Sequence, residues 1–156
     1  DAVTRHAVST IQIHRENWCN GRKNKPSTWI VVADECNDIC AWIKMQLTRH
    51  GFEVLITNNG VTALELIGAH LPAVALLDIM MPKMSGLDVA RKVRADPAVA
   101  QIGIILVSAR SSGRIDADLD ELVIDDYITK PFSPQELVKR INNVINHRHT
   151  TESTQP

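Results

Sequence analysis

Five short strand-like runs, mostly apolar, constrain the fold of this chain more than any other feature of its sequence. They cover residues 29–33, 52–57, 73–78, 102–107 and 123–128. Helical patterns lie between them at residues 36–50, 61–70, 87–95 and 110–122, and a last one begins at Ser133. Strands that alternate with helices predict a doubly wound α/β domain. Continuous apolar runs indicate parallel strands that are covered on both faces.

Turn and cap residues mark where these elements begin and end. Gly51 follows the first helical pattern, and glycine is the preferred residue just beyond a helix. Pro72 ends the second helix, and Asp96 with Pro97 ends the third. The last helix has a capping box over residues 133–136, with proline at the first helical position. These signals predict short connections and one compact domain.

Composition limits the class of protein. The chain has 156 residues, 44% of them hydrophobic, and a formal net charge of −1, so no basic field argues for direct nucleic acid binding. No apolar run is long enough to span a membrane. Three cysteines without disulfide or zinc-site spacing suit a reducing cytoplasm. We expect a flexible tail or linker at residues 1–27, a cytoplasmic domain at 28–147 and a polar tail at 148–156.

Polar side chains follow four of the predicted strands. Asp34 comes after the first strand, Asp78 after the third, Ser108 after the fourth and Lys130 after the fifth. The carboxyl ends of strands in an open α/β sheet meet at one crevice, where such folds bind ligands. Two carboxylates repel each other there unless a cation joins them, and oxygen ligands favour Mg²⁺. A lysine and a hydroxyl beside them suit the oxygens of a phosphoryl group, which Asp78 could accept as a nucleophile.

Three motifs in this chain resemble the receiver domain of two-component response regulators. Residues 78–82, DIMMP, followed by Ser85-Gly86, are similar to its phospho-acceptor motif. Residues 107–109, VSA, and residues 126–132, DYITKPF, are similar to its hydroxyl and lysine motifs. The order and spacing also resemble the family, over about residues 28–147. The resemblance implies a flavodoxin-like (βα)5 fold with a five-stranded parallel sheet.

The same resemblance implies a role for each residue near the crevice. Asp78 would accept a phosphoryl group from a histidine kinase or a histidine phosphotransfer protein. Asp34, Asp78 and the backbone carbonyl of Met80 would bind Mg²⁺. Ser108 and Lys130 would contact the phosphoryl oxygens. Tyr127 would follow the switch with its side chain, and Lys130-Pro131 would be a cis peptide.

The resemblance further implies a signalling switch and not a turnover enzyme. Phosphorylation would change the face formed by the fourth helix (residues 110–122), the fifth strand and the last helix. Output would pass to a downstream protein or to an effector domain missing from this piece, with a phosphorylation-dependent homodimer as one form. No nucleic acid binding by this piece and no membrane contact are expected.

Two stretches depart from the family pattern. The family usually has paired acids after the first strand, and here the first position is Ala33, although Glu35 follows Asp34. Losing one carboxylate is expected to weaken Mg²⁺ binding, which one or two carboxylates with water can still support. Residues 118–124, DLDELVI, replace a glycine-containing stretch, so the fourth helix is expected to be shifted or loosened.

Other readings stay open at this stage. A degenerate receiver could dock a partner without phosphorylation. A hydrolase or phosphotransferase could use Asp78 as its nucleophile, but the haloacid dehalogenase type would need a second acid two residues later, where Met80 stands. A flavodoxin-like electron carrier fits the fold class alone. Cys36 and Cys40 could pair as metal ligands or as a redox couple, but their place on an apolar helix face favours packing.

Overall fold

A computed structural model describes residues 28–109 and 124–152, with side chains as far as Arg148. Five strands form one sheet: β1 (Thr28–Ala33), β2 (Phe52–Thr57), β3 (Val74–Asp78), β4 (Gly103–Ser108) and β5 (Asp126–Thr129). The described helices are α2 (Asn37–Arg49), α3 (Gly60–His70), α4 (Gly86–Ala95) and α6 (Pro134–Glu152). None of the helices in these two ranges is long and apolar enough to cross a membrane.

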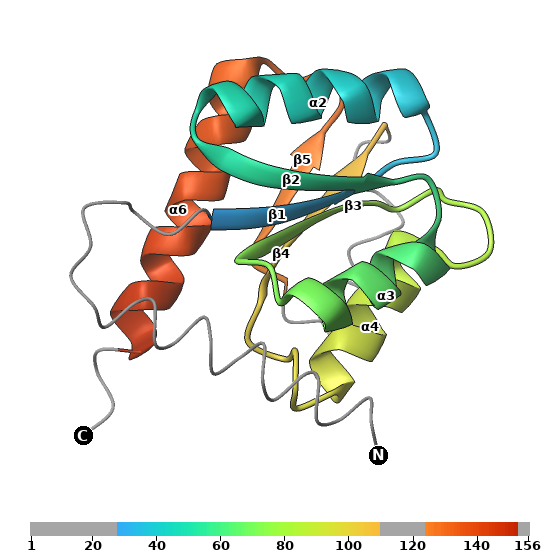
Figure 1. Ribbon diagram of the computed structural model, residues 1–156, viewed down its shortest axis with the longest axis vertical. Coiled ribbons are helices and arrows are strands. Elements are labelled where there is room, and N and C mark those ends of the chain that lie inside the picture. Colours follow the sequence, from blue (N-terminus) through green and yellow to red (C-terminus); the bar gives the residue numbers. More distant parts are fainter. Residues whose placement is uncertain (1–27, 110–123, 153–156) are drawn as a thin grey trace.

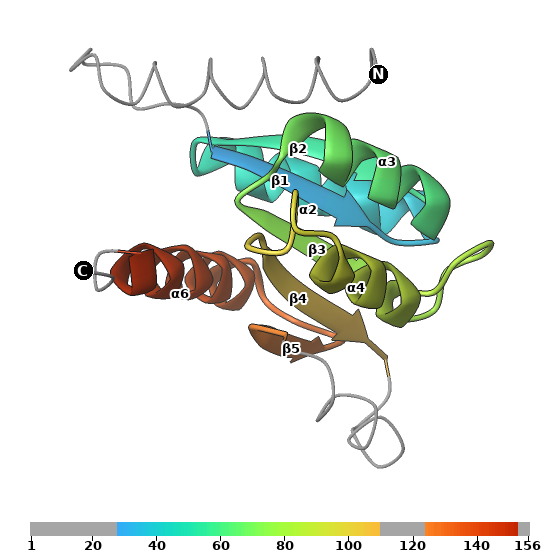
Figure 2. The ribbon, with the colours of Figure 1, turned by 90° about the horizontal axis from the view of Figure 1, so that it is seen from below.

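The strands are all parallel and lie in the order β2-β1-β3-β4-β5. Helices α2 and α6 cover one face of the sheet, and α3 and α4 cover the other (Figures 1 and 2). The chain order reverses between β1 and β3, and a doubly wound sheet opens its ligand crevice at such a point. The predicted parallel α/β fold is therefore confirmed.

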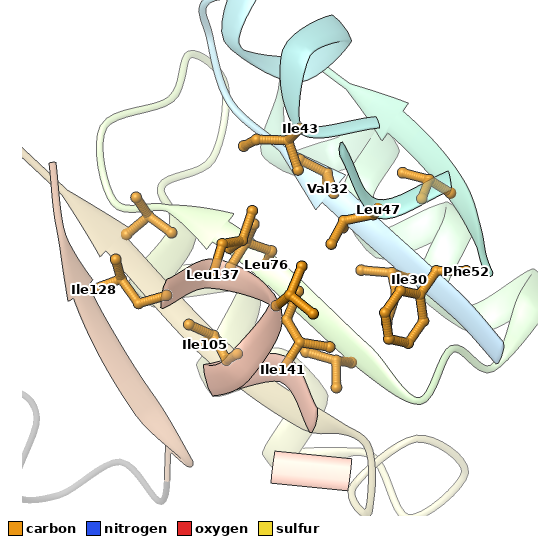
Figure 3. Close-up of a cluster of buried hydrophobic side chains, with 14 of the residues drawn as sticks. Ile30, Val32, Ile43, Leu47, Phe52, Leu76, Ile105, Ile128, Leu137 and Ile141 are labelled. Carbon is orange, nitrogen blue, oxygen red and sulfur yellow. The ribbon is translucent and has the colours of Figure 1, made fainter. Parts of the chain in front are cut away.

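Two apolar clusters hold the helices against the sheet. Side chains along β1 alternate between them, with Ile30 and Val32 facing α2 and α6, and Val31 and Ala33 facing α3 and α4. Figure 3 shows the first cluster, in which side chains of α2 and α6 meet those of the central strands. Burial on both faces explains why the central strands consist of continuous apolar residues.

Side-chain caps set the start of three helices. The Asn59 side chain accepts a hydrogen bond from the Thr62 amide at 2.9 Å, at the start of α3. Ser85 Oγ accepts the Asp88 amide at 3.2 Å at the start of α4. Ser133 Oγ accepts the Glu136 amide at 3.1 Å, as the predicted capping box requires. Each cap satisfies an amide that the first turn of a helix leaves unpaired.

Most element ends differ from the sequence-based expectations by no more than one residue, and larger differences occur at two elements. The fifth strand begins at Asp126 and not at residue 123, and the last helix runs to Glu152 instead of fraying into a tail from residue 147. The helix continues because Arg148 is anchored: its guanidinium contacts the Asp125 carboxylate and the carbonyl oxygen of Gln101. The helix predicted at residues 110–122 lies outside the described residues, as does the segment 1–27.

Candidate functional site

Asp34 and Asp78 stand side by side at the carboxyl ends of the two central strands. Ala33 of β1 is in register with Leu77 of β3, so the next residue of each strand is an aspartate. Both are buried, with 3% of Asp34 and 6% of Asp78 exposed. Two carboxylates this close and this dry need a cation between them, because burial removes the water that would otherwise screen their charges.

Lys130 supplies a positive charge to both carboxylates. Its Nζ lies 2.7 Å from Asp34 Oδ2 and 3.3 Å from Asp78 Oδ2. Its backbone amide donates to the carbonyl oxygen of Ser108 at 2.8 Å, which holds the lysine segment against the end of β4. The Lys130-Pro131 peptide is cis, as predicted. The structure thus gathers all four of the residues predicted at strand ends, with Ser108 itself buried.

Asp34 is held in place by hydrogen bonds at its side chain and at its backbone. The Cys36 amide donates to Asp34 Oδ1 at 2.9 Å, and the Asp34 amide donates to the carbonyl oxygen of Thr57 at 3.1 Å. The buried thiol of Cys40 lies 3.4 Å from the Asp34 carbonyl oxygen and 3.5 Å from that of Thr57. The backbone at the N-cap of α2 therefore positions this carboxylate, and the Cys40 side chain packs in the core beneath it.

Asp78 is held by the loop that follows it. The Met80 amide donates to Asp78 Oδ1 at 3.1 Å, so the chain bends back over the carboxylate. The Gly86 amide donates to the Ile79 carbonyl oxygen at 3.2 Å, which closes the loop at the start of α4. A Cβ on Gly86 would overlap the Asp78 carbonyl oxygen, so glycine is required there. The Met80 side chain is 62% exposed and borders the site on its solvent side.

The electrostatics of the site favour a bound cation. Burial raises the pKa of Asp78 above its ordinary value, and the neighbouring Asp34 adds to this, while the Met80 amide and Lys130 act against it. Burial alone would lower the pKa of Lys130, but its hydrogen bond to Asp34 and the two carboxylate charges outweigh burial and raise it. Lys130 is therefore charged across the physiological pH range. A further positive charge near Asp78 would stabilise its ionised form.

The donor set fits Mg²⁺ held partly by backbone and water. Within the ranges described, no three His, Cys, Asp or Glu side chains gather closely enough to form a metal cage. Asp34 and Asp78 supply carboxylate oxygens, and Glu35, beside them, is exposed. Mg²⁺ usually keeps several waters and takes only one or two protein carboxylates. The residues present therefore fit this ion.

A surface pocket of about 350 Å³ opens between the first turns of α2 and α3. Its lining is mostly uncharged polar residues: Asn37, Cys40, Ile56, Thr57, Asn58, Asn59 and Thr62. Burial and the nearby Asp34 charge raise the pKa of Cys40 to about 11, so its thiol stays protonated. No such pocket was predicted, because its walls come from turn residues without a motif.

Residues beyond the crevice connect β5 to its neighbours. Tyr127 is half-buried against the cluster that faces α3 and α4. Asp126 Oδ1 accepts both the Tyr127 amide at 2.8 Å and Arg140 of α6 at 2.7 Å. Asp125, in the loop before β5, is partly buried, and its Oδ2 lies 3.0 Å from Arg94 Nη2.

Comparison with known proteins bears directly on this arrangement. The family model of the response regulator receiver domain matches residues 30–142. The chain belongs to this family. It is 35% identical over 127 residues to the transcriptional regulatory protein CpxR of Escherichia coli strain K12, covering 81% of this chain and 53% of that protein. It is 36% identical over 132 residues to SrrA of Staphylococcus aureus strain NCTC 8325, covering 83% and 54%.

Solved receiver domains share its fold. The receiver domain of the Francisella response regulator 1452 is 30% identical, with a TM-score of 0.70 over 78% of this chain and 98% of that one. A CheY-like receiver protein of Methanospirillum hungatei has a TM-score of 0.75 at 24% identity, covering 80% and 98%. The chain spans about half the length of the curated relatives it matches, so their full activities are not transferred to this receiver domain.

Proposed function

We propose that this receiver domain is a phosphorylation switch that takes a phosphoryl group onto Asp78 from a phosphohistidine. The donor would be a histidine kinase or a histidine phosphotransfer protein. The observation that carries the proposal is the pair of buried carboxylates, Asp34 and Asp78, joined by the ammonium of Lys130. A structural ion pair alone would need one carboxylate, and the second one leaves negative charge that a divalent cation can neutralise.

The transfer is a displacement at phosphorus. An Asp78 carboxylate oxygen forms the new O–P bond as the P–N bond to the donor imidazole breaks, and the imidazole leaves with the electron pair of that bond. The Lys130 ammonium, 3.3 Å from Asp78 Oδ2, lies where it can contact an oxygen of the incoming group. The Ser108 hydroxyl, buried at the end of β4, is our second candidate for that contact.

Asp34, Asp78 and the Met80 carbonyl would hold Mg²⁺, which when bound offsets the charge that develops on the phosphoryl oxygens. Both Asp34 oxygens already accept a hydrogen bond, from the Cys36 amide and from Lys130. The exposed carboxylate of Glu35 follows Asp34 directly and is our candidate for one further oxygen, direct or through water. The absence of an acid at residue 33 is then partly compensated.

The output would be a change on the face that contains β5 and α6. Lys130 lies directly beyond β5, and Tyr127 lies within it, so a new contact at Asp78 would act on both. Arg140 of α6 lies 2.7 Å from Asp126 and 3.2 Å from Glu136, and these partly exposed charges could exchange partners with a second copy. We therefore include a phosphorylation-dependent homodimer and, by likeness to the transcriptional regulatory relatives, a transcriptional output.

The decisive experiment is phosphorylation by a small donor. The protein is incubated with acetyl phosphate, with Mg²⁺ or with EDTA, and its intact mass is compared with that of Asp78→Asn. We expect a gain of one phosphoryl group that requires both Mg²⁺ and Asp78. Trp42, whose ring centroid lies 5.9 Å from that of Phe132, provides a fluorescence signal for the lysine loop in the same titration.

The same data separate the alternative. A receiver that only docks a partner would gain no mass at millimolar Mg²⁺, and its Trp42 fluorescence would not respond to Mg²⁺. That result would refute the switch. Continuous release of inorganic phosphate from many donor molecules per protein, without a stable phosphoprotein, would instead indicate a phosphatase.

A further inference from the structure

We propose that Gly60, the first residue of α3, is a positioning residue that holds the loop 79–85 over the phospho-acceptor. This inference rests on the proposed function, because it concerns how the Asp78 site is kept in shape. Gly60 is far from the motifs in the sequence, and the three heavy atoms nearest to a Cβ at this position all belong to Met84 of the loop. Its effect on the site would therefore act entirely through the backbone of residues 79–85.

The contact between Gly60 and this loop leaves no room for a side chain. A Cβ on Gly60 would overlap the carbonyl oxygen of Met84 and would lie 2.7 Å from Met84 Cβ and 2.8 Å from the Met84 carbonyl carbon. Two of these three atoms belong to the backbone, so rotation of the Met84 side chain cannot relieve the overlap. Any larger residue at position 60 must displace the loop or the start of α3.

Little freedom is left elsewhere in the loop to absorb such a displacement. Lys83 has a φ of 66°, in the left-handed region that non-glycine residues rarely adopt. The Met84 amide donates to the Pro82 carbonyl oxygen at 2.8 Å, and the Gly86 amide donates to that of Ile79 at 3.2 Å. Because the loop is tight and hydrogen-bonded internally, a displacement of Met84 is expected to move its other residues as well.

The other end of that unit is the phospho-acceptor itself. The Met80 amide donates to Asp78 Oδ1, and Gly86 lies against the Asp78 carbonyl oxygen without space for a Cβ. A shift of the loop would therefore turn the Asp78 carboxylate and the Met80 backbone together. Gly60 is not needed for a left-handed conformation, since it is an ordinary helical residue capped by Asn59. The close approach to Met84 is thus the physical reason for glycine here.

Gly68 provides a matched control within the same helix. It is exposed, and a Cβ there would meet no heavy atom within 4 Å. Both substitutions add the same methyl group to α3, and only at position 60 does that group meet the loop, so a loss of Mg²⁺ affinity in Gly60→Ala alone reports the loop contact. We expect Gly60→Ala to raise the dissociation constant for Mg²⁺ roughly tenfold, the usual effect of disturbing a residue behind a metal ligand. Gly68→Ala is expected to leave it unchanged.

A readout in EDTA removes the metal from the comparison. Amide hydrogen exchange of Met80 and Gly86 should accelerate in Gly60→Ala and not in Gly68→Ala, while exchange in β1 and β3 stays as in the parent protein. A merely structural role would instead lower the unfolding free energy and speed exchange throughout the domain. Parent-like Mg²⁺ affinity together with parent-like exchange at Met80 and Gly86 would overturn the proposal.

If Gly60→Ala does not fold, the unmodified protein still tests the idea. Amide NMR signals of Gly60 and Met84 should shift during a Mg²⁺ titration with the same midpoint as that of Met80, while Gly68 stays still. A moving Met80 beside an unmoved Gly60 would refute the coupling. A protein that binds no Mg²⁺ at all would refute the proposed function, and the exchange comparison in EDTA would still decide the role of Gly60.

Discussion

Replacing the phospho-acceptor by its neutral isostere, Asp78→Asn, should make the domain more stable at neutral pH. Burial raises the pKa of Asp78 in the native state, so its ionised form is less favourable there than in the unfolded chain. Lys130 would not be left unpaired by the change, because it remains 2.7 Å from Asp34. The substitution removes one of two adjacent buried negative charges and keeps the shape of the side chain.

The expected increase in unfolding free energy depends on the surroundings of the Asp78 carboxylate. Asp78 is 6% exposed, so desolvation is nearly complete, but Lys130 and the Met80 amide recover part of its cost. We therefore expect a gain of about 1 kcal/mol, within the range for substitutions that remove one unfavourable feature. For a domain of this size that corresponds to a rise in Tm of roughly 3–6 °C.

The pH dependence of the stability difference between Asp78→Asn and the parent protein tests the sign of this effect. The native pKa of Asp78 is raised above the unfolded value of 3.8, so the parent protein loses stability as pH rises through that window. Below the unfolded value the carboxyl is protonated in both states, and the advantage of Asp78→Asn should vanish. Above the native pKa the advantage should be constant. Urea denaturation in EDTA, at pH 7 and at about pH 3.5, measures both limits.

Lys130→Met should instead destabilise the domain, and together with Asp78→Asn it forms a double-mutant cycle. It leaves both carboxylates without their cation, and we expect a loss of roughly 2–4 kcal/mol at pH 7. Combining it with Asp78→Asn should recover much of that loss, because one negative charge is then absent. This electrostatic account would be contradicted if Asp78→Asn were less stable than the parent at pH 7. It would also be contradicted if the stability gain were as large at low pH as at pH 7.

Three other predictions concern groups around the site. Arg148→Met should lower the unfolding free energy by about 1–3 kcal/mol in urea denaturation, since it removes hydrogen bonds to the partly buried Asp125 carboxylate. Unchanged stability would contradict the anchoring of α6. A thiol reagent at pH 8, followed by peptide mass mapping, should modify half-exposed Cys36 well before buried Cys40, whose pKa is raised to about 11. Glu35→Gln should weaken Mg²⁺ binding severalfold without changing stability, because this side chain is exposed; an unchanged dissociation constant would remove it from the ligand set.

The central strands could be read from the sequence because their burial is local information. Each is a run of apolar residues between turn signals. The edge strand β2 was also predicted, with both of its ends correct. The strand-end residues followed from topology, since the carboxyl ends of parallel strands share one edge. The cis Lys130-Pro131 peptide followed from the family resemblance. These features depend on composition and on neighbours in the chain.

What could not be predicted depends on contacts between distant residues. The length of α6 is decided by Arg148 reaching Asp125 and Gln101, and the helix pattern contains no sign of those partners. The partly buried Asp125 carboxylate likewise pairs with both Arg94 of α4 and Arg148 of α6, which lie far from it in the sequence. A glycine in a turn sequence gives no indication that it contacts a second loop. Long-range packing decides each of these cases.

The contact between Lys130 and Asp34 connects the edge of the sheet to its centre. Lys130 follows the edge strand β5, whereas Asp34 follows β1, and β4 and β3 lie between them. Three strand spacings amount to about 14 Å of sheet. The lysine side chain and the residues after β5 therefore link the edge strand to the centre of the sheet. A group arriving on Asp78 would compete with Asp34 for the lysine ammonium, and any movement of Lys130 would be passed to β5, at the edge of the sheet.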